Sequence, residues 1–231
     1  DIVSINTTTG DYTVVSSNAV ASIGNYVQLI APNDQRYYIQ TGSETNVYSL
    51  TDGSLLGSFD SILRLMPVGA VVLGDDDTDQ TISLDIADPS STLIKLGDNT
   101  VTYTGTSVSS GITAVDAGTL SVDGSIENST ANVSVGATLE GTGTIGGISN
   151  SGTVAPGNSI GTLTVSGNTV LNSNSILVIE VDTAGNSDKI ISSGSVAIDG
   201  TLRVSPSSGS YTGNNTYTFL TGSSISGTFS T

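Results

Sequence analysis

The alternation of apolar and polar residues along most of the chain predicts short β-strands. In Gly118–Gly124, Leu120 and Val122 alternate with Ser121 and Asp123. Successive side chains of a strand point to opposite faces, so this spacing is typical of a half-buried strand with its polar residues outward. Glycine and asparagine at the ends of such runs suit tight corners, because they tolerate a left-handed backbone. The fold class predicted from these patterns is all-β.

The same short pattern recurs along the chain. Gly118–Gly124 returns as Gly161–Gly167 and again as Gly200–Pro206, and a degenerate copy, Ala137–Gly141, follows the first at about half the interval. Self-similarity of this kind predicts a solenoid, and a coil of about 20 residues accommodates three short strands and three turns. Parallel strands need long connections, which a β-helix supplies because the rest of each coil is the connection. We therefore predict a parallel β-helix.

The distribution of aromatic residues supports the solenoid. No Phe, Tyr or Trp lies between Tyr103 and Tyr211. A globular sandwich of that size normally buries several aromatic side chains, because they supply so much of the core area. A narrow solenoid interior is filled instead by Val, Ile and Leu stacked from successive coils.

The region before Ser91 follows a different pattern. Ile2–Val15 and Val47–Leu56 each have the form strand, turn, strand. Their spacing is similar to that of β-propeller blades, although two such units cannot close a propeller. We predict two regions: residues 1–90, an irregular or propeller-blade-like β region whose fold the sequence does not assign, and residues 91–231, the β-helix.

The composition excludes several kinds of chemistry. The chain has no cysteine and no histidine. Missing cysteine excludes disulfides, Cys-ligated zinc and thiol nucleophiles. Missing histidine removes the commonest general base and the commonest metal ligand. The chain is therefore predicted not to be an enzyme, and its wealth of Ser, Thr, Asn and Gly suggests an exported protein.

The charge balance limits the partners. Five Lys and Arg against 21 Asp and Glu give a formal net charge of −16. Nucleic acids and anionic membranes are recognised through basic patches, so neither is expected to bind. The longest apolar stretch, Ile62 to Leu73, is interrupted by Arg64 and Pro67 and is too short to span a bilayer. The fragment is therefore not expected to span a membrane.

Several segments together resemble the passenger-associated repeat of bacterial autotransporters, over about residues 91–231. Ser91–Gly105 resembles its "L-x-K-x-G-x-x-T-x-T-x-x-G" strand pair, and Ala117–Gly124 the "N-A-G-T-L-x-V-x-G" strand that follows. The segment Val154–Gly161, with the sequence Val-Ala-Pro-Gly-Asn-Ser-Ile-Gly, is the most specific part. The resemblance also includes Gly136–Gly146, Asn150–Val165, Leu177–Ile190 and Tyr217–Leu220.

The resemblance implies a right-handed parallel β-helix at the surface of, or released from, a Gram-negative bacterium. Together with the missing histidine and cysteine, it leads to the hypothesis of a non-catalytic passenger or stalk that serves adhesion or surface scaffolding, with other cells, a host surface or glycans as partners. One alternative is a self-assembling subunit of an extracellular filament or matrix, because open solenoid ends expose strand edges that copies could join end to end. Another is the stalk of an autotransporter enzyme whose catalytic domain lies elsewhere.

An acidic cluster is the candidate metal site. Asp75, Asp77 and Asp79 alternate as carboxylates do at the start of a calcium loop, with Asp85 or Asp88 as further ligands. The positions that follow lack the Gly and Glu of an EF-hand, so an EF-hand is excluded, but a simpler oxygen-ligand Ca²⁺ site fits. The alternative is a solvated acidic loop, which charge runs usually form.

Two further patterns suggest catalysis only formally. Gly157–Gly161 matches the nucleophile elbow G-x-S-x-G, but no helix is predicted after it and no histidine exists, so Ser159 is interpreted as a coil corner. Glu180, Asp182 and Asp188 could form a glycosidase pair, but no aromatic residues surround them and Glu180 and Asp182 alternate with apolar residues as an outward strand face does. No catalytic residue is predicted.

Overall fold

The computed structural model describes residues 71–74, 78–211 and 215–230 in full, and otherwise only the backbone of the strands. The strands before residue 70 pair antiparallel, β1 with β2 and β3 to β6 in sequence. Ile2–Val15 and Val47–Leu56 thus each contain two paired strands, in agreement with the strand, turn, strand form predicted for them. The strands of this region are β1 (Ile2–Ile5), β2 (Tyr12–Ser16), β3 (Val27–Leu29), β4 (Arg36–Thr41), β5 (Glu44–Ser49), β6 (Leu55–Phe59) and β7 (Arg64–Met66).

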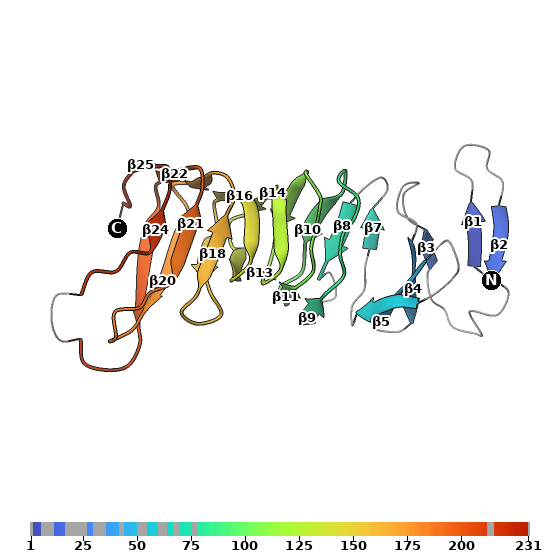
Figure 1. The fold of residues 1–231 in the computed structure, drawn as a ribbon, viewed down its shortest axis with the longest axis horizontal. Coiled ribbons are helices and arrows are strands. Elements are labelled where there is room, and N and C mark those ends of the chain that lie inside the picture. Colours follow the sequence, from blue (N-terminus) through green and yellow to red (C-terminus); the bar gives the residue numbers. More distant parts are fainter. Residues whose placement is uncertain are drawn as a thin grey trace.

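From β8 onward the strands form a parallel solenoid, whose coils stack along the long axis in Figure 1. The residues described in full contain no helix, so the all-β parallel β-helix predicted from the sequence is confirmed. The strands are β8 (Ala70–Leu73), β9 (Gln80–Ile82), β10 (Thr92–Lys95), β11 (Thr100–Tyr103), β12 (Ile112–Val115), β13 (Thr119–Val122), β14 (Ser125–Val133), β15 (Thr138–Gly141), β16 (Thr144–Asn150), β17 (Thr153–Pro156), β18 (Thr162–Val165), β19 (Thr169–Leu171), β20 (Ile176–Val181), β21 (Lys189–Ser192), β22 (Ser195–Ile198), β23 (Thr201–Pro206), β24 (Leu220–Thr221) and β25 (Ser224–Gly227).

From β13 onward each coil contributes strands to three faces, whereas the coils before it contribute two strands and isolated bridges at Ile86, Thr106 and Ser107. One face is a seven-stranded sheet in the order β23-β20-β17-β15-β13-β11-β9. The other two belong to a twelve-stranded sheet, because the long strands β14 and β16 bend at a register shift and continue from one face to the next. Beyond them the two faces separate, since β16 pairs with both β18 and β19. The three short strands per coil predicted from the repeat are therefore present from β13 onward.

The coils differ in length, although their strands keep register. On the seven-stranded sheet Thr100, Thr119, Thr138 and Thr153 are aligned in turn, so the last of these coils is shorter than the two before it. The pairing of Leu120 with Leu139 confirms that the degenerate copy of the repeat lies one coil after the first.

One repeat lies on a different face from the others. Gly161–Gly167 contains β18, which belongs to the twelve-stranded sheet, whereas the copies in β13 and β23 lie in the seven-stranded sheet. Each copy of the sequence repeat therefore forms a strand, but the copies do not occupy the same face of successive coils. The reason is that alternation fixes a strand locally, while the unequal lengths of the coils decide which face it joins.

The interior is a stack of aliphatic side chains, as predicted. Leu120, Leu139, Val154 and Leu177 come from four successive strands of the seven-stranded sheet and are at most 1% exposed. Burying a side chain of this size contributes roughly 1.5–3 kcal/mol. Among the residues described in full, Tyr103 is the one aromatic residue in the buried core, and its hydroxyl donates to the Leu84 carbonyl at 3.1 Å. Stacked aliphatic burial is thus the main source of stability.

The parallel ladder includes two strands that precede Ser91. β8 pairs with β10, and β9 pairs with β11, both in parallel. At its start, β7 covers the edge of β8 by antiparallel pairing. The solenoid ladder therefore reaches back to Ala70, while the two-region division at residue 90 stays a prediction.

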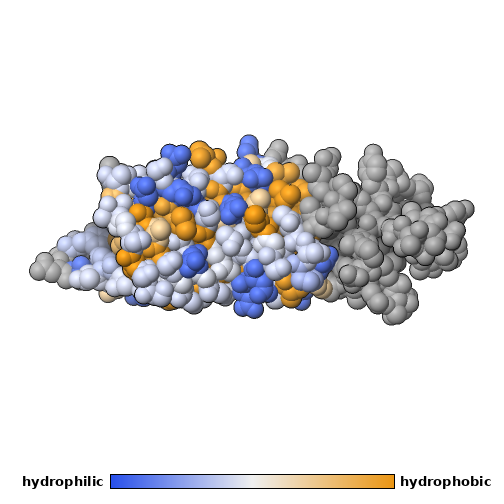
Figure 2. All heavy atoms as spheres, turned by 90° about the horizontal axis from the view of Figure 1, so that it is seen from above, coloured by the Kyte–Doolittle hydropathy of each residue, from blue (hydrophilic) through white to orange (hydrophobic). Residues whose placement is uncertain are grey.

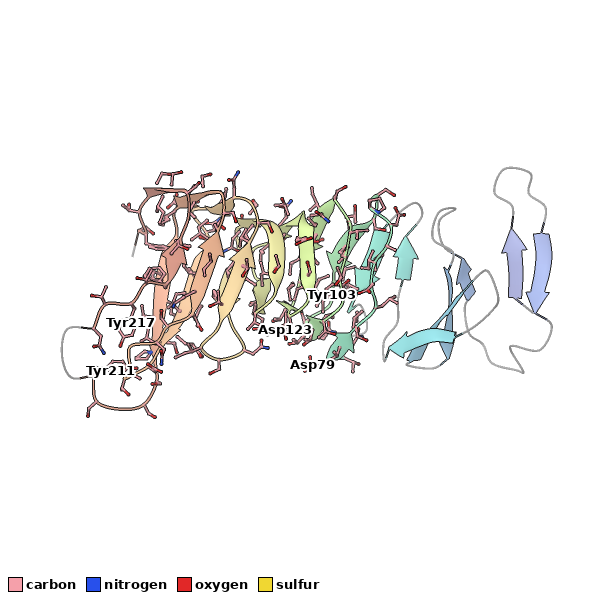
Figure 3. All side chains as sticks on the ribbon, viewed as in Figure 1. Asp79, Tyr103, Asp123, Tyr211 and Tyr217 are labelled. Atoms are coloured by element: carbon pink, nitrogen blue, oxygen red, sulfur yellow. The ribbon has the colours of Figure 1, made fainter. Side chains whose placement is uncertain are left out.

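Aromatic residues return at the last coil. Tyr211 and Tyr217 lie near the C-terminal end of the stack (Figure 3), where their hydroxyls donate to the carbonyls of Val181 and Asp182, each at 2.8 Å. Phe219 and Phe229 pack against the core with ring centroids 6.5 Å apart. Tyr217, Phe219 and Phe229 are partly buried against the core, whereas Tyr211 is 39% exposed.

The outer surface is largely polar, with apolar residues between. On the face shown in Figure 2, apolar side chains gather in small patches separated by polar ones. Small apolar patches separated by polar residues are ordinary on a protein surface. The most exposed large ones include Ile112, Val135, Val204 and Ile225. The part of the chain described in full has no helix long and apolar enough to cross a membrane.

Candidate functional site

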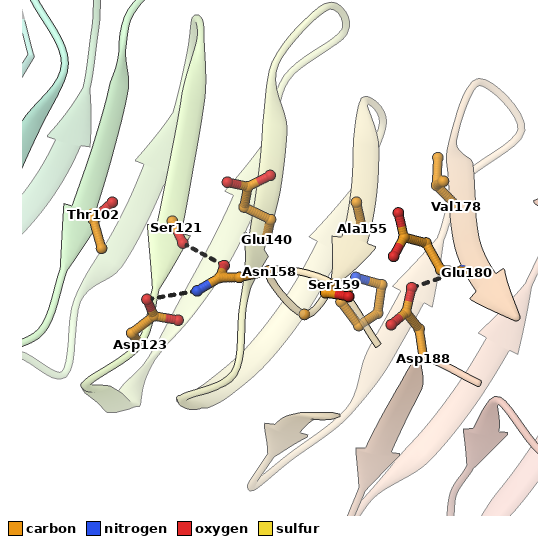
Figure 4. A pocket seen from close by; sticks show the side chains of 12 residues that line it. Thr102, Ser121, Asp123, Glu140, Ala155, Asn158, Ser159, Val178, Glu180 and Asp188 are labelled. Carbon is orange, nitrogen blue, oxygen red and sulfur yellow. Dashed lines mark hydrogen bonds between the residues drawn. The ribbon is translucent and has the colours of Figure 1, made fainter. Parts of the chain in front are cut away.

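A groove of about 450 Å³ lies on the outer face of the seven-stranded sheet (Figure 4). Successive strands supply one outward residue each to its floor. These residues are Thr102, Ser121, Glu140, Ala155 and Val178. Parallel strands place equivalent residues about 4.8 Å apart, so the floor is a straight row along the solenoid axis.

One side of the groove is formed by residues 157–161, which connect β17 to β18 and fold back over the sheet. Asn158 donates from Nδ2 to Asp123 Oδ2 at 3.0 Å, and its Oδ1 accepts from the Ser121 hydroxyl at 3.4 Å. Ser121 points outward, as predicted, but it is only 2% exposed. The outward side chain is covered because the Asn158 segment, far along the chain, bonds it.

Asp188 fixes the other end of this segment. The residue is 2% exposed, and its carboxylate accepts from the backbone N–H of Gly161 at 2.9 Å and of Glu180 at 2.7 Å. Burial raises the pKa of Asp188, and the charge of Glu180 adds to the rise, while the two N–H donors act against it. Asp188 therefore organises the backbone around the groove.

Glu140 lies on the groove floor and is half-buried. Burial raises its pKa, and the neighbouring charge of Asp123 raises it further. Asp123 accepts three hydrogen bonds, from Thr142 N at 3.0 Å, from Thr142 Oγ1 at 3.2 Å and from Asn158 Nδ2 at 3.0 Å. The two carboxylates thus differ in environment: Asp123 is bound to neighbouring coils, whereas the surroundings of Glu140 favour its protonated form.

Ser159 is exposed in the turn between β17 and β18, where the sequence predicts a coil corner. It lines the groove, yet the nucleophile elbow would need a strand-to-helix turn at this point. The segment after Ser159 continues into a strand instead. Ser159 therefore lies at a corner of its coil.

The three carboxylates considered as candidates for a glycosidase pair lie at two different sites. Glu180 and Asp188 line the groove with Glu140 and Asp123 (Figure 4). Asp182 lies instead in a tight turn, where hydrogen bonds from the side chain and backbone of Asn186 lower its pKa. Sequence reasoning missed Glu140 and Asp123 as neighbours of this set, because only the register of the coils brings them together.

The predicted calcium cluster is only partly described. Asp75 and Asp77 lie outside the described residues. Asp79 Oδ1 accepts from Thr100 N at 2.7 Å, and Asp85 Oδ1 accepts from Thr106 N at 2.6 Å. Asp88 Oδ1 accepts from the backbone and hydroxyl of Ser90.

The described residues contain no group of three or more metal-ligating side chains. Asp79, Asp85 and Asp88 each hold a nearby backbone N–H, so at least one oxygen of each carboxylate already has a partner. The Ca²⁺ site stays a prediction.

Several acidic residues along the stack accept hydrogen bonds from the backbone of neighbouring coils. Asp79, Asp85 and Asp123 each accept a backbone N–H from the next coil. Asn168 does the same for Ser195. Corners of a solenoid leave N–H groups outside the strand ladder, and a short carboxylate or amide satisfies them. Part of the negative charge is therefore explained by the fold itself.

The buried Lys95 donates hydrogen bonds to backbone carbonyls at the corners of the coils. Its side chain is 0% exposed, and Nζ donates to the carbonyls of Leu96 at 2.6 Å, Gly97 at 2.8 Å and Ala117 at 3.2 Å, and to Asn99 Oδ1 at 3.0 Å. An ammonium group needs several acceptors when it leaves water. The corner carbonyls supply them, which explains a lysine inside the solenoid.

The comparisons with known proteins add one relative. A stretch of 115 residues, 49% of this chain, is 37% identical to the "Extracellular serine protease" of Serratia marcescens. The matched stretch spans 11% of the length of that protein. No family model matches the chain. The similarity is compatible with an exported, autotransporter-like protein and with the β-solenoid described above.

Proposed function

We propose that this chain is a non-catalytic β-helical stalk in the passenger of an exported bacterial protein of the autotransporter type, and that it serves as a surface scaffold. The observation that carries the proposal is the uninterrupted parallel ladder from β8 to β25. A solenoid of this kind grows by adding coils, so it sets a distance between whatever lies at its two ends.

The chemistry of the polar residues supports this role. Asp79, Asp85, Asp123 and Asp188 hold backbone groups of neighbouring coils, and Lys95 satisfies corner carbonyls. Each of these side chains is explained by holding the stack together. The groove offers carboxylates, an amide and a hydroxyl, but two of its four carboxylates, Asp123 and Asp188, serve as structural acceptors.

The similarity to the extracellular protease favours a second candidate, in which the stalk belongs to an enzyme. The matched part is a small fraction of that protein. In this case the catalytic residues of the whole protein lie outside residues 1–231, and the solenoid carries the catalytic domain. The location proposed in both cases is the exterior or surface of a Gram-negative cell.

The test uses the purified chain in two assays. The stalk proposal expects no hydrolysis of casein or of fluorogenic peptide and glycoside substrates, and no binding of the labelled chain to bacterial or host cells above that of an unrelated acidic β-protein. Hydrolysis that is lost in Ser159→Ala or Glu140→Gln would overturn the non-catalytic assignment. Saturable binding to cells or to a glycan array would assign adhesion in place of scaffolding.

A further inference from the structure

Solenoid coils contact their nearest neighbours, and their stability is approximately a sum of neighbouring terms. Residues 157–161 depart from this rule because they contact a strand two places away in the seven-stranded sheet. We infer that this segment, here named the clasp, couples non-adjacent coils so that the coils from β13 to β20 open as one cooperative unit.

The first end of the clasp is Asn158. The segment leaves β17, passes the edge of β15 and reaches the outer face of β13. There the Asn158 side chain bonds Asp123 and Ser121 (Figure 4). Asp123 also holds Thr142, which follows β15. One carboxylate thus joins the coils of β13, β15 and β17.

The second end is Gly161. Its N–H donates to Asp188, whose other oxygen accepts from Glu180 in β20. Because Asp188 is buried, losing these donors would leave a desolvated carboxylate, which is costly. The clasp therefore connects β13 at one end with β20 at the other, across four adjacent strands of the sheet.

The sequence of the clasp follows from its compact shape. Gly157 has φ of +92°, and a side chain there would overlap the Ser159 carbonyl oxygen. A side chain on Gly161 would lie 2.8 Å from the Gly157 Cα atom. Both glycines are therefore required for the segment to close on itself. The backbone geometry of the clasp therefore explains the sequence Gly-Asn-Ser-Ile-Gly without a catalytic role for Ser159.

Coupling changes how the stack opens. Without the clasp, the coil of β13 could open while that of β20 stayed closed, since only their immediate neighbours would be affected. With it, opening at β13 breaks the Asn158 bonds to Asp123 and Ser121 and releases the segment that Asp188 anchors. The amides of β13 and β20 are then expected to share one opening free energy.

Hydrogen exchange of the full chain, followed by mass spectrometry or NMR, tests this. In the parent protein the amides of β13 and β20 should show the same opening free energy. In Asn158→Ala the β13 amides should exchange about tenfold faster, because a hydrogen bond to a charged group is lost. The exchange rate of the β20 amides should change less than about twofold. The decisive quantity is this difference between the two strands.

Two control variants separate coupling from plain destabilisation. Asn172→Ala removes a bond to Ser151 at 3.2 Å between coils that are adjacent in the stack, so in a coupled unit it should speed exchange in β13 and β20 by the same factor. Ser159→Ala changes an exposed residue of the clasp itself and should alter neither strand.

Two results would overturn the inference. One is a parent protein whose β13 and β20 amides already open with different free energies. The other is an Asn158→Ala variant that accelerates both strands equally. If Asn158→Ala fails to fold, Asp123→Asn replaces it, since this variant keeps the side-chain shape and removes the charge that receives Asn158 Nδ2. The same divergence of β13 from β20 is then required.

Discussion

The sequence pattern Gly-Thr-Leu-x-Val occurs in the middle of the stack and again in its last coil, with different results. In β13, Leu120 and Val122 are at most 1% exposed. In β23, the equivalent Leu202 is half-buried and Val204 is 51% exposed. The strand forms in both places, but it is buried only where a coil lies on each side. Local alternation thus makes the strand, and stacking supplies its stability.

Core truncation should give the largest contrast between the two regions. Leu139→Ala in the middle of the stack is expected to lower the free energy of unfolding by about 2–5 kcal/mol, because it leaves a cavity between packed coils. Leu202→Ala in the last coil should cost less than about half as much, since its neighbourhood is open on one side. Urea denaturation followed by far-UV circular dichroism measures both. Equal losses would contradict the dependence on stacking.

Much of the fold follows from the sequence, and the reasons are specific. The alternation of Leu120 and Val122 predicts a strand, and the recurrence of the pattern at Leu139 predicts its partner. Neither the alternation nor its recurrence predicts the length of the coil between β17 and β20, so the face that β18 occupies could not be predicted. Alternation describes neighbours along the chain, whereas coil lengths are set by corners.

The groove shows the same limit more strongly. It brings Glu140 and Asp123 together with Glu180 and Asp188 from other coils, and the clasp covers Ser121 from a later coil. These contacts depend on the register of several coils at once. The Gly-Asn-Ser-Ile-Gly segment was the available signal, but its match to a catalytic pattern said nothing about where it folds.

The buried Lys95 and the exposed Lys189 allow the same comparison between buried and exposed positions for a charged side chain. Lys95→Met should destabilise the chain by about 3 kcal/mol, because it leaves the part-buried carbonyls of Leu96, Gly97 and Ala117 without the Lys95 Nζ donor. Lys189 is exposed, so Lys189→Met should leave the free energy of unfolding almost unchanged. Denaturant titration of the two variants provides the comparison. A Lys95→Met variant as stable as the parent would show that the carbonyls find other donors.

The corner carboxylates should have a smaller effect. Asp85→Ala removes the acceptor of Thr106 N at 2.6 Å, and since this bond is exposed the loss should be about 1 kcal/mol. Glu127 is exposed, and Glu127→Ala should cost only a small fraction of that loss. Thermal unfolding at one salt concentration compares the two, because both variants remove one negative charge. Equal melting temperatures would argue that the corner bond contributes nothing.

Acidification should give the smallest effect, with a sign opposite to ordinary acid denaturation. The folded-state pKa values of Glu140 and Asp188 are raised by burial, so the folded protein binds more protons than the unfolded chain between their ordinary and raised pKa values. Their contribution to stability is therefore complete below the ordinary pKa and is lost as pH rises through the raised one. Asp182, whose pKa is lowered, acts in the reverse direction at lower pH.

The variant Glu140→Gln isolates this contribution. It removes the titrating group from the groove, so the rise in unfolding free energy on acidification from neutral pH should become shallower. Glu127→Gln makes the same change in charge at an exposed position outside the groove and should keep the parent slope. Because both variants alter the net charge equally, the difference between their slopes reports the surroundings of Glu140, which are its burial and the nearby charge of Asp123. Identical slopes would contradict a raised pKa for Glu140 in the folded protein.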